Sequence, residues 1–123
     1  HLVLTTIHAP SAASVIPRLI DMGIEAYLLS SAVSLILSQR LVRVFDYSIG
    51  LYGERRGVFE LVQVDSQVRD MIHQKKTAYE IERYLVDSGH VLLRDACSEM
   101  YSRHVTTEEE IKRINLDIFS CKL

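Results

Sequence analysis

The sequence predicts an α/β segment that is followed by a bundle of helices. Residues 2–7 form an apolar run with β-branched members, and residues 40–45 and 57–64 form two further strand-like runs. Beyond these runs, apolar residues recur at helical spacing over most of the remaining chain. We therefore expect an α/β unit over residues 1–64 and an α-helical unit over residues 65–123.

The composition is that of an ordinary globular protein. Of the 123 residues, 48% are hydrophobic and 24% are charged, and the chain has only 5 Gly and 2 Pro. The net charge of -2 gives no bulk attraction to nucleic acid or to an anionic membrane, and no apolar run approaches the roughly 20 residues of a transmembrane helix. Cys97 and Cys121 stand apart rather than in CxxC pairs, which favours a reducing, cytosolic compartment.

The first strand and the helix after it come from the opening residues. Residues 2–7 lack a clean alternation of apolar and polar side chains, which is typical of a strand that is covered on both faces. A helix should follow and end before Gly23, which suits a left-handed C-terminal cap. If Ser14 is the N-cap, Pro17 lies harmlessly in the first turn; if the helix begins at Ser11, Pro17 should kink it.

A second helix and a pair of strands complete the α/β unit. Glu25 is suited to the positive end of a helix, and residues 26–37 are apolar nearly all round, so we expect a deeply buried helix there. Residues 40–45 and 57–64 read as strands, and residues 46–56 between them are rich in turn formers. An antiparallel pair is the simplest arrangement of these two strands.

Helix start signals recur after residue 64. The predicted helical segments are 65–74, beginning at Asp65 or Ser66, then 77–89, 92–101 and 106–114. Thr77 is the expected N-cap of the second segment. The last segment offers two overlapping capping boxes, which would pair Thr106 with Glu109 and Thr107 with Glu110.

Two histidines flank the first predicted strand. His8 follows the strand, with Thr5 and Thr6 before it, and polar residues at that place commonly line the ligand crevice of an open α/β sheet. The alternative is an ordinary surface or capping histidine. A shared zinc site is poorly supported, because His1 and His8 should lie roughly 23 Å apart on an extended segment. Cys97 belongs to the apolar stripe of a helix and is expected to be a buried core thiol.

No complete catalytic motif is present in these residues. The sequence has no GxxxxGK[ST] phosphate-binding loop, no Gly-x-Ser-x-Gly elbow and no His-Glu-x-x-His pair. The cluster GERRG at 53–57 places two arginines at a predicted junction of loop and strand, where they could pair with a carboxylate or phosphate or simply form a solvated hairpin tip. Arg40 has apolar neighbours and should need a fixed partner.

Several segments, in order and at fitting spacing, resemble the traffic ATPases of type II secretion, type IV pilus assembly and DNA-uptake machines. HLVLTTIHA at 1–9 resembles that family's histidine box, often written GHLVLSTLHTNDA. IPRLIDMGIEAYLL at 16–29 resembles ARLIDMGVEPYLI, QRLVR at 39–43 is a close match, and YGERRGVFELV at 52–62 resembles YRGRTGIYELL. LLRDA at 92–96 and TTEEEI at 106–111 also fit, so the resemblance covers nearly the whole chain.

The resemblance implies a fold and an activity. Residues 1–64 would be the C-terminal portion of a RecA-like ATPase core, from the histidine box onward, and residues 65–123 a helical C-terminal subdomain. In the intact family, a homo-hexamer hydrolyses ATP with Mg²⁺ at the cytoplasmic face of the cell membrane and acts on an inner-membrane platform protein. Walker A and Walker B precede the histidine box in that family, so we expect this sequence to be a C-terminal fragment that is inactive alone and holds no nucleotide.

The resemblance also assigns roles to individual residues. His8 would sense the γ-phosphate, and His1 would stand at the base of the same strand. The matching positions expected at contacts between subunits or subdomains are Gln39, Arg40, Arg55, Gly57 and Glu60, with Arg56 as a neighbour that replaces a family threonine.

The sequence departs from the family pattern in two places. Ala9, Pro10 and Ser11 replace the polar residues that follow the second histidine. Residues 44–54 contain no cysteine, whereas many members carry two zinc-binding CxxC pairs there, so no zinc is expected. The competing hypothesis is a non-enzymatic, helical protein–protein interaction module. A coding region upstream with GxxxxGK[ST] would favour the ATPase, and a start codon just before His1 would favour the module.

Overall fold

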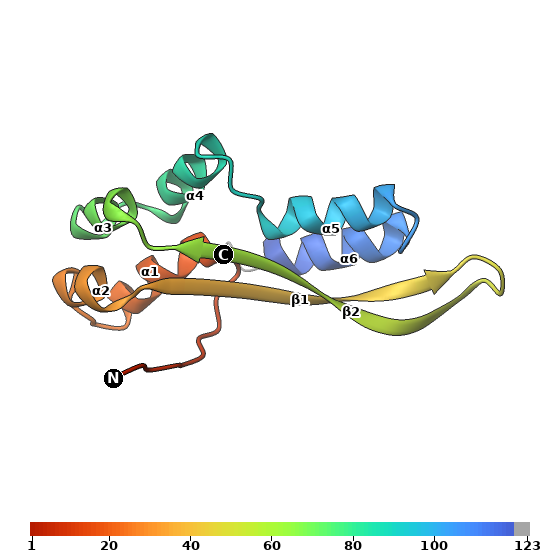
Figure 1. The fold of residues 1–123 in the computed structure, drawn as a ribbon, viewed down its shortest axis with the longest axis horizontal. Coiled ribbons are helices and arrows are strands. Elements are labelled where there is room, and N and C mark those ends of the chain that lie inside the picture. The colour runs from red at the N-terminus through yellow and green to blue at the C-terminus, as the bar shows by residue number, and fades with distance from the viewer. Residues whose placement is uncertain (120–123) are drawn as a thin grey trace.

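A long two-stranded hairpin runs through the molecule, and six helices pack along it (Figure 1). The computed structural model describes the backbone of residues 1–119 and the side chains of residues 1–114. The elements in chain order are α1 (Ala12–Asp21), α2 (Ala26–Ala32), β1 (Leu35–Asp46), β2 (Leu51–Gln63), α3 (Ser66–His73), α4 (Ala78–Asp87), α5 (Leu93–Ser102) and α6 (Glu108–Phe119). Helices α1 to α4 gather at the end of the hairpin that lies away from its turn, and α5 and α6 lie nearer the turn.

Residues 1–9, which we call the arm, are extended but do not form the predicted strand at 2–7. Within the described part of the chain the sheet contains only β1 and β2, so the arm has no neighbouring strand with which to share backbone hydrogen bonds. Leu2, Val3 and Leu4 are 89%, 78% and 87% exposed. The arm therefore presents apolar side chains to solvent. Figure 1 shows its backbone running away from the hairpin.

Helix α1 follows the second of the two predicted starts. Ser11 is the N-cap, its backbone N–H donates to Ser14 Oγ at 3.0 Å, and the two residues form a capping box. Pro17 accordingly lies inside the helix. Gly23 follows the C-cap with φ +95°, and its N–H donates to the carbonyl of Ile20 at 2.9 Å, as predicted for a left-handed glycine cap.

The predicted helix over 26–37 is wrong in its second half. Helix α2 ends at Ala32, and β1 begins at Leu35. The apolar run is compatible with a buried helix and with a strand. Residues from 35 onward form a strand because they pair with β2, where Ile36 lies opposite Val62 in the ladder. The expected deep burial of this helix is also wrong, because Tyr27 and Leu28 are 59% and 47% exposed.

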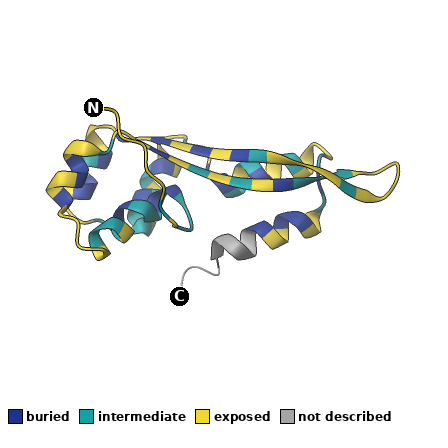
Figure 2. Cartoon of the chain, turned by 90° about the horizontal axis from the view of Figure 1, so that it is seen from below, coloured by how far each residue is buried: buried dark blue, intermediate teal, exposed yellow. Residues whose placement is uncertain are grey.

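The antiparallel strand pair is confirmed, and it is longer than predicted. The register runs from Leu35 opposite Gln63 to Asp46 opposite Leu51, with an irregularity between Arg43 and Phe45. The cluster at 53–57 therefore lies inside β2 and not at a junction of loop and strand. More and less buried residues alternate over residues 35–42 of β1 and 57–63 of β2 (Figure 2), so one face of this part of the sheet is covered and the other is open.

Two separate apolar cores cover one face of the hairpin. The proximal core joins the ends of the strands near Ile36 and Val62 to helices α1 to α4. The distal core lies nearer the hairpin turn and consists of Val42, Val58, Leu93, Cys97, Ile111 and Ile114. Cys97 is fully buried, as predicted, and burial raises the pKa of its thiol; Cys121 lies outside the described residues.

The predicted helix caps are present, with one change. Asp65 Oδ1 accepts from the backbone N–H of Val68 at 2.8 Å, and Thr77 forms a capping box with Glu80. At α6, Thr107 Oγ1 accepts from the backbone N–H of Glu110 at 3.2 Å. The carboxylate of Glu110 does not return to the cap, because arginine side chains take it instead.

Candidate functional site

The arm that carries both predicted histidines is tied to the hairpin at its base. The side chains of His1 and His8 are exposed on the arm. The backbone carbonyl of Pro10, two residues after His8, accepts a hydrogen bond from Arg40 Nη2 at 3.2 Å. Arg40 Nη1 also donates to the carbonyl of Gln39 at 2.8 Å. Arg40, which the sequence suggested would need a fixed partner, thus anchors the segment next to His8.

Glu60 lies beside the base of the arm and holds the start of helix α5. Its side chain is 3% exposed, and Glu60 Oε2 accepts from the backbone N–H of Leu93 at 3.0 Å. The N-cap of α5 is Leu92, whose side chain cannot cap, so Glu60 supplies the missing acceptor from β2. Burial raises the pKa of Glu60, and the Leu93 N–H partly opposes that shift.

Glu60 also lines a small hollow beside the base of the arm. Glu60 Oε1 is buried and has no hydrogen-bond partner among the described residues. Pro10, Ser11 and Arg94 contribute to the lining of this hollow, and Arg94 Nη1 forms an ion pair with Glu82 at 2.5 Å. The base of the arm, Arg40 and Glu60 therefore form one junction, which we call the arm junction.

The arm junction does not form a phosphate cradle by itself. Binding a nucleotide requires several backbone N–H groups or cationic side chains aimed at the phosphates. The guanidinium of Arg40 bonds the base of the arm, the nearby guanidinium of Arg94 is paired with Glu82, and the side chain of His8 is exposed. These residues could complete a nucleotide site but could not hold ATP and Mg²⁺ alone.

The remaining predicted contact residues lie farther along the hairpin. Arg55 is opposite Arg43 in the ladder, and Arg56 forms an exposed ion pair with Glu54 at 3.2 Å. Gly57 is covered by the ring of Phe59, because a Cβ at Gly57 would come within 2.8 Å of the ring. The structure thus brings Arg40 and Glu60 together at the arm junction but places Arg55, Arg56 and Gly57 elsewhere.

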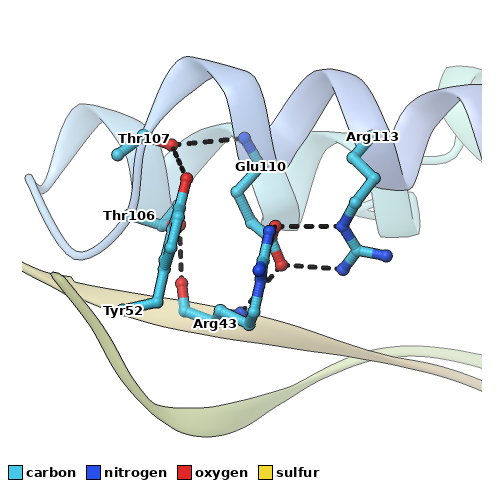
Figure 3. A network of polar contacts seen from close by, with 6 residues as sticks. All are labelled: Arg43, Tyr52, Thr106, Thr107, Glu110 and Arg113. Carbon is cyan, nitrogen blue, oxygen red and sulfur yellow. Dashed lines mark hydrogen bonds and ion pairs between the residues drawn. The ribbon is translucent and has the colours of Figure 1, made fainter.

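Sequence reasoning missed the most strongly bonded polar group of the described chain, Glu110. Its side chain is fully buried, and both oxygens accept hydrogen bonds (Figure 3). Arg43 donates from its backbone N–H at 3.0 Å, from Nε at 2.9 Å and from Nη2 at 2.7 Å. Arg113 donates from Nε at 3.0 Å and Nη2 at 2.8 Å. Hydrogen bonds from Arg113 and Arg43 hold the pKa of Glu110 far below its usual range.

Further contacts fix β1 and β2 to the start of α6 around this carboxylate. Thr106 Oγ1 donates to the carbonyl of Arg43 at 2.7 Å, and the hydroxyls of Tyr52 and Thr107 lie 2.6 Å apart. The guanidinium of Arg43 stacks 4.1 Å from the centre of the Tyr52 ring. No local pattern in the sequence indicates this network, because a Thr three residues before a Glu predicts a capping box, and that explains Glu110 without any arginine.

Next to the Glu110 network the surface is hollowed. A depression of about 340 Å³ is lined by Leu41, Arg43, Arg55 and Arg113. Three guanidinium groups from β1, β2 and α6 thus face one space. Among the described residues, the carboxylate of Glu110 lies beside this depression and is shared by Arg43 and Arg113.

The family of this chain follows from comparison with known proteins. The model of the family described as "Type II/IV secretion system protein" matches residues 1–113. The chain belongs to this family. The type II secretion system protein E of Pseudomonas aeruginosa is 34% identical over 149 residues, which cover 93% of this chain and 30% of that protein. The type II secretion system protein HxcR of the same organism is 31% identical over 135 residues, covering 95% of this chain and 29% of that protein.

Solved structures show the same fold. The pilus retraction motor PilT with bound ADP superposes with a TM-score of 0.71 at 22% identity, over 93% of this chain and 32% of that one. The ATPase DotB of Yersinia pseudotuberculosis gives a TM-score of 0.69 at 22% identity, over 89% and 29%. The resemblance to secretion ATPases is therefore confirmed, and these structural neighbours are RecA-like ATPases. The chain spans about 30% of the length of the relatives that it matches.

Two searches of the described residues bear on other classes of site. None of the described helices combines the length and the apolar character that crossing a membrane would require. In the same part of the chain, no group of three or more His, Cys, Asp or Glu residues is placed to hold a metal ion.

Proposed function

We propose that this chain works as part of an ATP-hydrolysing motor for type II secretion or for pilus assembly. The observation that carries the proposal is the family match over residues 1–113, together with 34% identity to a type II secretion system protein E. Two structural neighbours are described as a pilus retraction motor with bound ADP and as an ATPase, which supports the same activity class.

In this proposal the chain contributes one part of the nucleotide site. Hydrolysis of ATP requires a phosphate cradle, Mg²⁺ and a positioned water. The 123 residues contain no GxxxxGK[ST] loop, so the cradle and the Mg²⁺ ligands would come from sequence outside them. His8 would approach the γ-phosphate from the arm, with His1 at the N-terminal end of the same segment, and this chain alone would be inactive.

The contacts at the arm junction would couple the arm mechanically to the hairpin and to α5. Arg40 holds the carbonyl of Pro10, so a displacement of the arm at His8 pulls directly on β1. Pro10 also lines the hollow that Glu60 faces, and Glu60 holds the start of α5. We infer that the arm, the hairpin and α5 move together when the state of a bound nucleotide changes.

The proposed assembly is a homo-hexamer at the cytoplasmic face of the membrane, acting on an inner-membrane platform protein. Gln39, Arg55 and Arg56 have exposed side chains that suit contacts between subunits. Glu60 is buried, so its contact is internal to the chain. The proposal covers a motor for secretion, for a pilus or for DNA uptake, and no nucleic acid is proposed as a direct ligand.

A chimera tests the proposal. Residues 1–113 would replace the matching part of the Pseudomonas aeruginosa type II secretion system protein E, and ATP hydrolysis and secretion would be measured. We expect activity to be retained and His8→Ala to lower turnover by about 10²–10³-fold, the typical cost of one donor near developing charge. His104→Asn is the matched control, because it changes another exposed histidine and asparagine tolerates the positive φ of 56° found there.

The outcomes test the motor proposal and the role of His8 separately. A correctly folded chimera without ATP hydrolysis would contradict the motor proposal and favour a non-enzymatic interaction module. Equal rates for His8→Ala and the parent chimera would remove only His8. For the 123-residue chain itself, we expect calorimetry to detect no micromolar binding of Mg-ATP and elemental analysis to find no equivalent of zinc.

A further inference from the structure

Glu60 is a buried acid with one unsatisfied oxygen. The residue is 3% exposed, and Oε2 accepts from the backbone N–H of Leu93 at 3.0 Å. Oε1 is buried as well, and no donor among the described residues bonds to it. A neutral acid in this place loses one hydrogen bond, whereas a carboxylate loses the hydration of a charge, which costs far more. The geometry therefore favours the protonated form of Glu60.

The charged groups around Glu60 come from β1, α4 and α5, and none of them donates to Oε1. Arg94 on α5 is paired with Glu82 on α4 at 2.5 Å, and Arg40 on β1 donates to two backbone carbonyls. Burial is the largest cause that raises the pKa of Glu60, ahead of the opposing hydrogen bond from the start of α5. Of the charged neighbours, Glu82 and Asp95 raise this pKa further and Arg94 lowers it.

The residues that cover Glu60 belong to the arm junction itself. Pro10 and Ser11, at the base of the arm, and Leu92, before α5, line the hollow beside it. The hollow has a volume of only about 20 Å³. Because described residues already bury Oε1, its lack of a partner does not depend on what else covers the outer surface. Water reaches this oxygen only if the base of the arm or the start of α5 moves.

We propose that Glu60 is a proton switch that is linked to the position of the arm. While the base of the arm closes the hollow, Glu60 keeps its proton. When the base of the arm moves away, water reaches Oε1, the acid ionises and the proton passes to solvent. Linkage is reciprocal, so a rise in pH that removes the proton favours the displaced arm to the same extent.

Arg40 offers a way to separate this linkage from a simple effect of charge. Its Nη2 donates to the carbonyl of Pro10 at 3.2 Å and so holds the base of the arm closed. Loss of this bond should loosen the arm and let water reach Glu60, which lowers the pKa of the acid. Loss of the positive charge alone acts in the opposite direction, because a nearby cation favours the carboxylate.

The test is a titration of the 123-residue chain between pH 3 and pH 9, followed by NMR at the side-chain carboxyl carbon of Glu60. The signal is assigned by its loss in Glu60→Gln. We expect the midpoint of the parent chain to lie above the ordinary value of 4.5. Arg40→Gln and Pro10→Gly should both shift the midpoint down toward 4.5. Pro10→Gly frees the backbone at the base of the arm without changing any charge.

Two controls accompany these variants. Arg83→Gln removes an exposed arginine on α4 and should not lower the midpoint. An unfolded chain would also titrate near the ordinary value, so the methyl signals of Ile72 and Leu85, which are fully buried, must keep their parent positions. If one of the two arm variants does not fold, the other carries the test.

Each result decides the question. A parent midpoint at or below 4.5 would overturn the proposal, because Glu60 would then be an ordinary or stabilised carboxylate. A folded Arg40→Gln or Pro10→Gly chain whose midpoint stays the same or rises would overturn the link to the arm. The inference rests on the contacts of the arm junction, and none of these measurements uses ATP. Its failure is therefore distinguishable from failure of the proposed motor function.

Discussion

The two halves of the hairpin are stabilised in different ways. At the end away from the turn, the proximal core collects fourteen buried residues, twelve of them from four helices and both strands. Nearer the turn, the distal core has six. The distal half adds the Glu110 network, in which a buried carboxylate on α6 is bonded by Arg43 of β1 and by Arg113 of α6 itself.

The difference shows what a long, thin hairpin requires. Apolar burial is not directional and grows with the area covered, so four helices are enough to hold the proximal half. The distal half is covered by only α5 and α6, and its apolar core is small. Directional hydrogen bonds to Glu110 fix the strand against the helix there, at the cost of burying a charge that depends on its partners.

The largest effect is expected from removing the carboxylate of the distal half. Glu110→Ala leaves Arg43 and Arg113 without their shared partner and deletes the hydrogen bonds that Arg43 of β1 makes to α6. We expect a loss of about 3–5 kcal/mol in the free energy of unfolding, measured by urea denaturation. Amide hydrogen exchange should accelerate over residues 41–46 before it does in the proximal half.

The matched control for this variant is Glu109→Ala. Glu109 lies in the same turn of α6, but its side chain is exposed. Its loss should change stability by no more than about 0.5 kcal/mol. Similar effects of the two substitutions would mean that the Glu110 network does not hold the distal half.

A comparable loss is expected in the proximal half, but by a different route. Ile72 is fully buried in the proximal core, so Ile72→Ala should cost about 2–5 kcal/mol through lost burial and the cavity left behind. Ile72→Val removes one methyl group and should cost about 0.5–1.5 kcal/mol. Urea denaturation measures the free energy of unfolding of both variants. A loss that does not depend on pH would distinguish the proximal core from the distal half.

Acid should weaken the distal half selectively. The pKa of Glu110 is far below its usual value near 4.5, because arginine hydrogen bonds favour the charged form. The native state therefore binds its proton only at much lower pH than the unfolded chain does, and its stabilising contribution is present above about pH 4.5 and is lost as the pH falls below it. Denaturation between pH 6 and pH 3 should show this loss, and Glu110→Gln should remove that part of it.

Local signals predicted most of the secondary structure correctly. The caps at Asp65 and Thr77 and the glycine stop at Gly23 depend on a few adjacent residues, and all are present. The errors at residues 2–7 and 33–37 have the opposite cause. An apolar run becomes strand only where another strand pairs with it, and that partner is not visible in the run itself.

The contacts of the candidate site were likewise predictable only where they depend on neighbouring residues. The need of Arg40 for a partner followed from its apolar neighbours, and the structure supplies the carbonyl of Pro10. The Glu110 network could not be foreseen, because Arg43 and Glu110 are 67 positions apart and the local pattern already explained Glu110 as a cap. Pairing between distant charges is fixed by tertiary packing and leaves no periodic trace in the sequence.

The smallest effect concerns Glu60, the buried carboxylate between the two halves. Burial raises its pKa, so the native state keeps the proton to a higher pH than the unfolded chain does. Stability from this group is therefore present below about pH 4.5 and declines as the pH rises through the raised pKa, the reverse of Glu110.

Glu60→Gln keeps an oxygen to accept from Leu93 N–H and removes the charge, so we expect a gain of up to about 1 kcal/mol in the free energy of unfolding at pH 7. Glu60→Ala removes the acceptor as well and should cost about 0.5–2 kcal/mol, as lost helix caps do. Urea denaturation of both variants at pH 5 and pH 8 measures the difference, and a Glu60→Gln variant less stable than the parent at pH 8 would show that the charge itself is required at the start of α5.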